Sequence, residues 1–355
     1  MSNPVDNEKL SGQALRDAWI KIVEEKPRTY PRDAANQLGV SEAELIASKI
    51  GDNVTRLEGD WDVFVKRLPA LKQVLSITRN ETCVLEHKGN FQKVETFGSG
   101  PHHMGQVIGP IETRLFLANW FVAFHVINPK AKGFMESIQI FDKSGDAVTK
   151  IYLKEKGDRE AFEQLVADYT SENQSKKQAV TAPAEKPHTP KEEVDGEALR
   201  KDWSELKDTH DFFGMIRKHK AHRYDALELA GEQFAYRVKI DSLQPLLEKV
   251  AADQFPIMIF AGNRGNIQIH QGKVKNIKPM GDWLNIMDPN FNMHLRTSLV
   301  HDAWVVKKPT TDGEVTSIEL FDKDKELVTQ FFGLRKPGIP EREQWREYVS
   351  QLEKN

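Results

Sequence analysis

One short stretch, Asp208-Thr209-His210-Asp211-Phe212-Phe213, combines residue types that suit metal and macrocycle chemistry. Asp208 can cap the start of a helix, with a second acid three residues later as in a capping box. His210 then lies in the first helical turn, where the positive end of the helix dipole favours the neutral imidazole that binds metals. The two phenylalanines and Ile216 add apolar bulk that suits a planar macrocycle. The pattern predicts a candidate metal ligand, although a first-turn histidine that binds nothing has the same sequence.

The other histidines and the single cysteine give weaker signals. No His-x-x-x-His pair lies with a carboxylate in the zincin arrangement, and one cysteine, Cys83, excludes thiolate zinc sites and an internal disulfide. His270 and His294 lie in apparent strands, where structural histidines are common. Cys83 is expected to be a small buried residue on a strand, which is compatible with a reducing cytosol.

Length and composition predict an ordinary water-soluble protein of two domains. The chain has 355 residues, 39% hydrophobic and 29% charged, with a formal net charge of −3. This charge gives no electrostatic case for nucleic acid or a membrane surface, and no apolar run approaches the roughly 20 residues that span a bilayer. The first residues, 1–6, lack a basic stretch followed by an apolar core, so we expect no signal peptide and a cytoplasmic location. Whether the protein is a monomer or a dimer stays open.

The two halves of the chain repeat one another. Leu15-Arg16-Asp17-Ala18-Trp19 returns 184 residues later as Leu199-Arg200-Lys201-Asp202-Trp203. Ser137-Ile138-Gln139-Ile140-Phe141-Asp142 returns 180 residues later as Ser317-Ile318-Glu319-Leu320-Phe321-Asp322. Ordered matches with small drift indicate a tandem duplication. At offsets of 184, 183 and 182 residues, His210 maps onto Lys26, Pro27 and Arg28 respectively, so only the second copy carries the candidate ligand.

The organisation along the chain predicts an N-terminal repeat at 1–171, a linker at 172–196 and a C-terminal repeat at 197–355. The linker is rich in Ser, Gln, Lys, Glu and Pro, and it has too few apolar residues to order itself by burial. Each repeat begins with helices and ends with strands joined by tight turns such as Asp142-Lys143-Ser144-Gly145. We therefore expect an α+β fold of two homologous tandem repeats, each a largely antiparallel β-sheet flanked by helices, related by a pseudo-twofold.

Residues 32–49 have the pattern of a helix-turn-helix, with Leu38-Gly39-Val40-Ser41 at the turn before a capped helix. The second helix opens with Glu42 and Glu44, and these carboxylates stand where phosphates or base edges would approach. The favoured interpretation is a helical pair packed on its own sheet. Haem-responsive DNA binding through this segment is kept as the alternative.

Several long motifs in both halves resemble one bacterial family. In the second half these are 263–270, 283–285, 291–296, 308–313 and 316–321; in the first half they are Thr78-Arg79-Asn80-Glu81, Arg114-Leu115-Phe116-Leu117 and Ser137-Ile138-Gln139-Ile140-Phe141-Asp142. In order and content they resemble the haem-utilisation proteins of the HemS/ChuS type, also called haemin-degrading factors. The resemblance covers the chain apart from the linker.

That resemblance implies one haem b in a cleft between the halves, held by a single axial histidine, which matches His210. The distal arginine of the family matches Arg114. The remaining expected contacts are to the propionates, through Arg223, Lys308, Gln330 and Arg335, and to the apolar wall, through Phe260 and Phe332. Phe332 stands where some relatives have Tyr, which removes one hydroxyl hydrogen bond. Cations at one edge and hydrocarbon elsewhere match the two carboxylates and the apolar face of haem.

The sequence thus predicts a cytoplasmic haem-binding protein that sequesters, traffics or degrades imported haem for iron acquisition. The family includes proteins described as haem chaperones and proteins credited with haem cleavage, and no residue separates the two classes here. Cleavage would make haem the substrate, with Arg114 hydrogen-bonding the distal ligand and electrons from an external donor. The implied partners are haem and a protein of one of three kinds: a haem importer, a haem oxygenase or a reductase.

Overall fold

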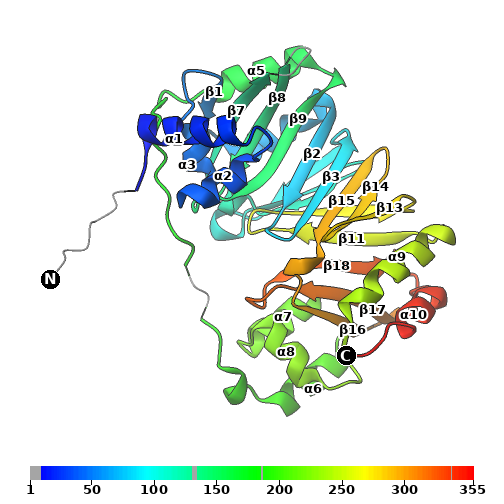
Figure 1. The fold of residues 1–355 in the computed structure, drawn as a ribbon. Helices are drawn as coiled ribbons and strands as arrows, with labels where there is room; N and C mark the ends of the chain where they lie inside the picture. Colours follow the sequence, from blue (N-terminus) through cyan, green and yellow to red (C-terminus); the bar gives the residue numbers. More distant parts are fainter. Residues whose placement is uncertain (1–8, 130–133, 185–186, 337) are drawn as a thin grey trace. The chain divides into compact units, whose positions relative to one another are not determined.

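The computed structural model describes residues 9–129, 134–184, 187–336 and 338–355, and the contacts within it group the chain into two compact units (Figure 1). Unit 1 consists of Met1–Thr78, His87–Ala184 and Asn263–Ile267; unit 2 consists of Arg79–Glu86, Glu185–Gly262 and Gln268–Asn355. Each unit thus includes a short segment from the other half of the chain. The segment predicted as a linker divides between the units, and the boundaries at 171 and 197 stay predictions.

The main sheet of unit 1 has the strand order β1-β7-β8-β9-β2, and every neighbouring pair is antiparallel. A further antiparallel run has the order β6-β5-β4. The strands of the first half of the chain are β1 (Val54–Leu57), β2 (Lys72–Arg79), β3 (Cys83–Gly89), β4 (Lys93–Phe97), β5 (Met104–Ile108), β6 (Glu112–Leu115), β7 (Val122–Pro129), β8 (Phe134–Phe141) and β9 (Ala147–Gly157), and most of β3 belongs to unit 2. The α-helices are α1 (Gly12–Glu25), α2 (Pro31–Leu38), α3 (Glu42–Ala47), α4 (Trp61–Arg67) and α5 (Arg159–Tyr169).

The main sheet of unit 2 repeats this plan with the order β10-β16-β17-β18-β11, again antiparallel throughout. Its further run is β15-β14-β13. The strands are β10 (Ala235–Val238), β11 (Ile257–Gly262), β12 (Asn266–Gly272), β13 (Ile277–Met280), β14 (Trp283–Met287), β15 (Phe291–Arg296), β16 (Asp302–Thr310), β17 (Gly313–Phe321) and β18 (Leu327–Gly333). The α-helices are α6 (Gly196–Ser204), α7 (Asp211–Lys218), α8 (Arg223–Ala230), α9 (Leu243–Ala252) and α10 (Glu343–Ser350).

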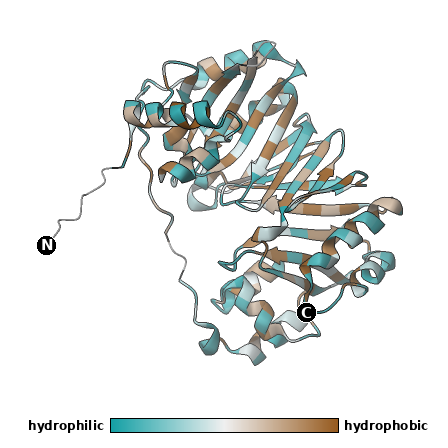
Figure 2. Ribbon diagram, viewed as in Figure 1, coloured by the Kyte–Doolittle hydropathy of each residue, from teal (hydrophilic) through white to brown (hydrophobic). Residues whose placement is uncertain are grey.

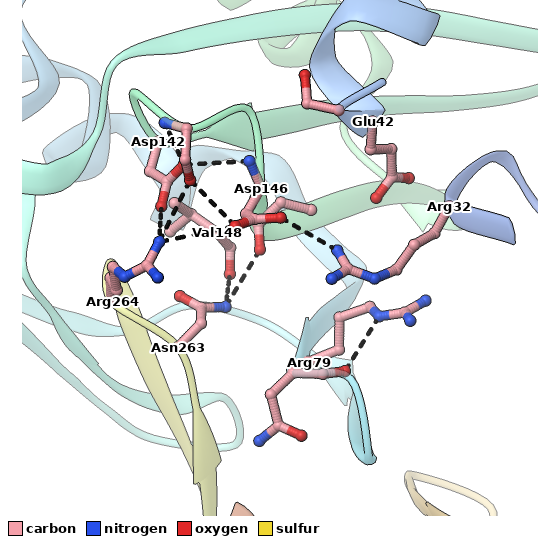
Figure 3. Close-up of polar contacts among 12 residues, drawn as sticks. Arg32, Glu42, Arg79, Asp142, Asp146, Val148, Asn263 and Arg264 are labelled. Carbon is pink, nitrogen blue, oxygen red and sulfur yellow. Dashed lines mark hydrogen bonds and ion pairs between the residues drawn. The ribbon is translucent and has the colours of Figure 1, made fainter. Parts of the chain in front are cut away.

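The matching strand orders confirm the predicted α+β fold of two tandem repeats, while the pseudo-twofold between them stays a prediction. The repeat extends to single hydrogen bonds at the exchanged segments. In unit 2, Asn80 Nδ2 donates to Val328 O at 2.8 Å; in unit 1, Asn263 Nδ2 donates to Val148 O at 2.9 Å. Figure 3 shows the second of these bonds. The two asparagines thus fix equivalent hairpin tips to equivalent strands.

Helices cover both faces of each main sheet. Alternate side chains along a strand point to opposite faces, so each strand contributes residues to two helix-covered layers. In unit 2, Val306 and Phe321 pack with residues of α6, α7 and α8, whereas Val305 and Leu320 pack with residues of α9 and α10. Figure 2 shows hydrophobic residues distributed along the strands of both units. Among the described residues, no helix combines the length and apolar content needed to cross a bilayer.

The predicted linker is anchored by polar contacts rather than by apolar burial. The guanidinium of Arg56, a buried residue on β1, donates to Ser175 O and Lys177 O at 2.9 Å each and also to Gln178 Oε1. Burial lowers the pKa of Arg56. Farther along, Thr189 N donates to Lys220 O in unit 2. Composition gave no indication that a buried arginine would hold this segment.

The equivalent arginine of unit 2 is satisfied in another way. Arg237 on β10 donates to Glu228 Oε1 at 2.6 Å and to the Tyr224 hydroxyl at 2.8 Å, and it lies 3.5 Å from Asp302 Oδ1. Asp302 is the first residue of β16. The equivalent strand of unit 1 is β7, and its first residue is the uncharged Val122. Among the described residues no acid forms an ion pair with Arg56, so the connecting segment supplies neutral oxygens in place of the missing carboxylates.

Candidate functional site

The start of α7 presents His210 to solvent. Its imidazole is 93% exposed, and His210 Nδ1 lies 2.6 Å from Asp208 Oδ1, which also accepts from the backbone N–H of His210 at 2.8 Å. Asp211 Oδ2 in turn accepts from the backbone N–H of Asp208 at 3.1 Å. Asp208 was predicted to be the N-cap residue, but these two contacts lie before the helix, and neither is a side-chain cap to a helical N–H. The regular helix begins at Asp211, so His210 lies at its N-cap position, one residue before the first turn.

The contact with Asp208 orients the imidazole of His210. The backbone N–H of His210, its imidazole and the charge of Arg335 together hold the pKa of the Asp208 carboxyl below its usual range. A carboxylate beside Nδ1 fits the tautomer in which Nδ1–H donates, which leaves the Nε2 lone pair free. An exposed imidazole that is oriented by a carboxylate has the arrangement common among metal-binding histidines.

A buried cluster of polar groups lies on one face of the main sheet in unit 2. The register places Glu319 on β17 opposite Gln330 on β18 and opposite Trp304 on β16. Lys308 is four residues beyond Trp304 along β16 and therefore points to the same face. Arg223, the first residue of α8, reaches this face from the helical layer. Three of the predicted propionate contacts thus meet around one acid that had not been predicted as a site residue.

Glu319 is the centre of this cluster. Arg223 forms a two-pronged contact, from Nε to Glu319 Oε2 at 2.9 Å and from Nη2 to Oε1 at 2.7 Å. Lys308 Nζ and Gln330 Nε2 each donate to the same Oε1 at 2.9 Å. Burial by itself would raise the pKa of the Glu319 carboxyl, but Arg223 and Lys308 outweigh burial and hold that pKa well below its usual range. Burial lowers the pKa of the Lys308 ammonium.

Two buried guanidinium nitrogens in this region suit an incoming anion. Arg223 Nη1 and Arg335 Nη1 are buried and have no hydrogen-bond acceptor among the described residues. Arg335 Nη1 lies 3.8 Å from Asp312 Oδ2, which is an ion-pair distance but not a hydrogen bond. A buried donor without an acceptor costs about 1–3 kcal/mol. A carboxylate bound here would supply the missing acceptors, so the residues present fit the two acidic groups of haem.

Aromatic rings border the cluster. Arg223 lies over the rings of Phe212 and Phe213 at 5.0 and 5.3 Å, and Lys308 lies 4.6 Å from the centre of the Phe212 ring. Phe213, three residues after His210 in the sequence, is 59% exposed. Phe260 and Phe332, both partly buried, meet edge to face at 5.3 Å. The two residues predicted for an apolar wall are therefore adjacent rings on β11 and β18.

Arg114, the predicted distal residue, belongs to unit 1. It lies on β6 with a side chain that is 35% exposed, and its Nη2 lies 3.1 Å from Glu112 Oε1. The other seven predicted site residues all belong to unit 2. The role of Arg114 stays a prediction from family resemblance.

The helical pair at 32–49 is formed, but its second helix is buried rather than displayed. Of the six residues of α3, Glu42, Ala43, Leu45, Ile46 and Ala47 are buried. This core also contains Phe124 and Phe141 of the main sheet in unit 1, so the pair packs on its own sheet. Figure 3 shows Arg32 directed at Asp146, with 3.5 Å between Nη1 and Oδ1. These observations count against a recognition helix.

Unit 1 carries a reversed version of the charge cluster. Gln139 lies opposite Lys150, as Glu319 lies opposite Gln330 in unit 2. The first residue of α3 is the acid Glu42, where α8 begins with Arg223, and Lys150 forms an ion pair with Glu42. An acid in place of an arginine disfavours a carboxylate ligand. The two halves therefore differ not only at His210 but also in the charged residues at equivalent positions of the main sheets and the helices beside them.

Comparisons with known proteins identify relatives that match most of the chain. The family model of the haemin-degrading HemS/ChuX domain matches residues 39–169 and 220–352. The hemin transport protein HmuS of Yersinia pestis is 34% identical over 341 residues, covering 96% of this chain and 97% of that protein. The crystal structure of holo-PhuS, a heme-binding protein of Pseudomonas aeruginosa, has a TM-score of 0.92 at 43% identity and covers 96% of this chain and 99% of that one. ChuS, described as an E. coli heme oxygenase, has a TM-score of 0.84 at 32% identity, covering 95% and 99%.

The chain belongs to the HemS/ChuX haemin-degrading family, and the family domain occurs in it twice. The recognition made from sequence motifs is therefore confirmed. Glu319 is the site residue that sequence reasoning missed. Its signal was present in the sequence, because an acid stands inside Ser317-Ile318-Glu319-Leu320-Phe321, a segment otherwise typical of a buried strand.

Proposed function

We propose that this protein binds one haem b per chain, with His210 as the axial ligand of the iron, and handles imported haem in the cytoplasm for iron acquisition. The observation that carries the proposal is the pair of unused buried donors, Arg223 Nη1 and Arg335 Nη1, in the same unit as the exposed His210. The names of the relatives, a hemin transport protein and a heme-binding protein, support it.

In this proposal each group of residues has a separate task. Bound haem would supply three features: two propionates, a large apolar face, and an iron that accepts the imidazole. Arg223 and Arg335 donate to the propionates, Lys308 and Gln330 add positive charge and a further donor, and the edge-to-face pair of Phe260 and Phe332 covers hydrocarbon. A haem importer, a haem oxygenase or a reductase would be the protein partner, according to whether haem is received, passed on or degraded.

A haem titration of the purified apo-protein is expected to saturate at one haem per chain, with a Soret band typical of histidine ligation. The physical reason is the reversed charge cluster of unit 1, where Glu42 stands in place of Arg223. Absorbance difference titration with a protein-only reference gives the stoichiometry. Two equivalent haems would overturn the asymmetric site and direct attention to His87 or His125 as a second ligand.

Haem cleavage is the second candidate function, because a close structural relative is described as a heme oxygenase. Under this hypothesis Arg114 hydrogen-bonds the distal ligand. The complex supplied with a reductase and oxygen is then expected to yield an open-chain tetrapyrrole by mass spectrometry, and Arg114→Ala to lower the yield while preserving haem capture. Recovery of intact haem from the wild-type protein would leave sequestration and transfer as the function. An unchanged yield from Arg114→Ala would remove Arg114 from the distal site.

A further inference from the structure

We infer that Glu319 is a positioning residue for ligand carboxylates, holding Arg223, Lys308 and Gln330 in one arrangement without contacting the ligand itself. The inference rests on the proposed haem site and adds a residue to it. Glu319 is completely buried and accepts hydrogen bonds from all three side chains, whose distances are given above. Ser317 Oγ adds a further donor to Oε1 at 3.1 Å.

The two-pronged contact fixes the direction of the unused donor. A guanidinium is planar, so a carboxylate that engages Nε and Nη2 determines where Nη1 points. Nη1 of Arg223 is the nitrogen left without an acceptor. Glu319 therefore sets the direction in which Arg223 can donate to a ligand, and the rings of Phe212 and Phe213 confine the same guanidinium.

Glu319 also keeps two cations close together. Arg223 Nη2 and Lys308 Nζ both donate to Oε1, so their mutual repulsion is offset by one shared negative charge. In Glu319→Gln that charge is gone, and an amide N–H₂ faces at least one of the donors. Arg223 and Lys308 would then move apart, and the binding arrangement would have to be rebuilt when a carboxylate arrives, which weakens binding.

The first repeat shows that the fold itself does not require an acid at this position. Gln139 is the equivalent residue of β8, opposite Lys150, and it is buried in a main sheet with the same strand order. A glutamine is thus accommodated in this place in the strand. In unit 2 the negative charge of Glu319 is paired with the positive charges of Arg223 and Lys308.

The test compares haem with haem dimethyl ester, in which both carboxylates are blocked. In Glu319→Gln we expect the rate of haem transfer to apomyoglobin to rise about tenfold or more, as expected when one charge-assisted contact is lost. The Soret position should be unchanged, because His210 still ligates the iron. For the dimethyl ester the variant and the wild-type protein should differ by less than about twofold.

The matched control is Glu341→Gln, which alters another buried acid of unit 2 whose two oxygens accept from the backbone N–H of Thr316. Its haem transfer rate should equal that of the wild-type protein. If Glu319→Gln folds poorly, the double variant Glu319→Gln/Lys308→Met removes the unpaired ammonium as well. Because Lys308 is itself a proposed propionate contact, the double variant is compared with Lys308→Met alone. It should transfer haem faster than that single variant, while the two transfer the ester at equal rates.

The outcomes separate the positioning role from the function on which it rests. Equal haem transfer rates for Glu319→Gln and the wild-type protein would overturn the positioning role while leaving haem binding intact. Equal acceleration for haem and its ester would also overturn it, because a general loss of structure acts on both ligands. A wild-type protein that shows no histidine-type Soret band would instead contradict the proposed function.

Discussion

Replacing His210 with alanine is expected to shift the Soret band and to raise the rate of haem transfer to apomyoglobin by at least about 100-fold. Even partners that only orient a metal-binding histidine are worth roughly 10- to 100-fold in affinity, so loss of the ligand itself should reach or exceed that range. Haem capture should weaken rather than vanish, because Arg223, Arg335 and the aromatic wall remain. Absorption spectra and stopped-flow transfer kinetics measure both effects.

The same substitution is expected to leave stability unchanged. The side chain of His210 is almost fully exposed and makes no capping hydrogen bond at the start of α7. His301→Ala is the matched control, since His301 Nδ1 also lies beside an aspartate, 3.0 Å from Asp302 Oδ2, on an exposed side chain of the same unit. A wild-type Soret position and transfer rate in His210→Ala would place the ligand elsewhere.

The fold was predictable from the sequence because its signals are local and occur twice. The alternation in Val315 to Phe321 and the turn at Asp142 identified antiparallel strands, and both were confirmed. In the second copy Lys325 adopts a left-handed φ of 64° where the first copy has Gly145. A repeat period locates such equivalent turns even when the turn residue differs.

The candidate site could be proposed from the sequence only in part. His210 was proposed from its own neighbours, and Arg223, Lys308 and Gln330 were proposed from family resemblance. Their convergence on Glu319 depends on the register between β17 and β18, which no local pattern of residue types reveals. Arg56 illustrates the same limit, because an arginine held by backbone carbonyls of a distant segment has no signature in its own strand.

Glu341 gives unit 2 a pH-dependent stability that is independent of haem. It is 4% exposed, and its two oxygens accept from Thr316 N at 3.0 and 3.2 Å, where β17 extends beyond its pairing with β18. Among the described residues no cation forms an ion pair with it. Burial therefore raises the pKa of the Glu341 carboxyl from its ordinary 4.5 to about 7, although Thr316 and Arg346 oppose the rise.

Between pH 4.5 and pH 7 the folded protein retains a proton on Glu341 that the unfolded chain has released, so this group lowers stability as pH rises through that window. Since one pKa unit corresponds to about 1.4 kcal/mol, the loss approaches about 3 kcal/mol at pH 8.

We expect Glu341→Gln to abolish this loss of stability, because the amide oxygen still accepts from Thr316 N and carries no charge. Urea unfolding of both proteins at pH 5, 6, 7 and 8 measures the difference, which should be small at pH 5 and favour the variant by about 3 kcal/mol at pH 8. Glu343→Gln, at the start of α10, is the exposed control and should follow the wild-type curve. Parallel curves for Glu341→Gln and the wild-type protein would show that the Glu341 carboxyl is already ionised at pH 5 in the folded state.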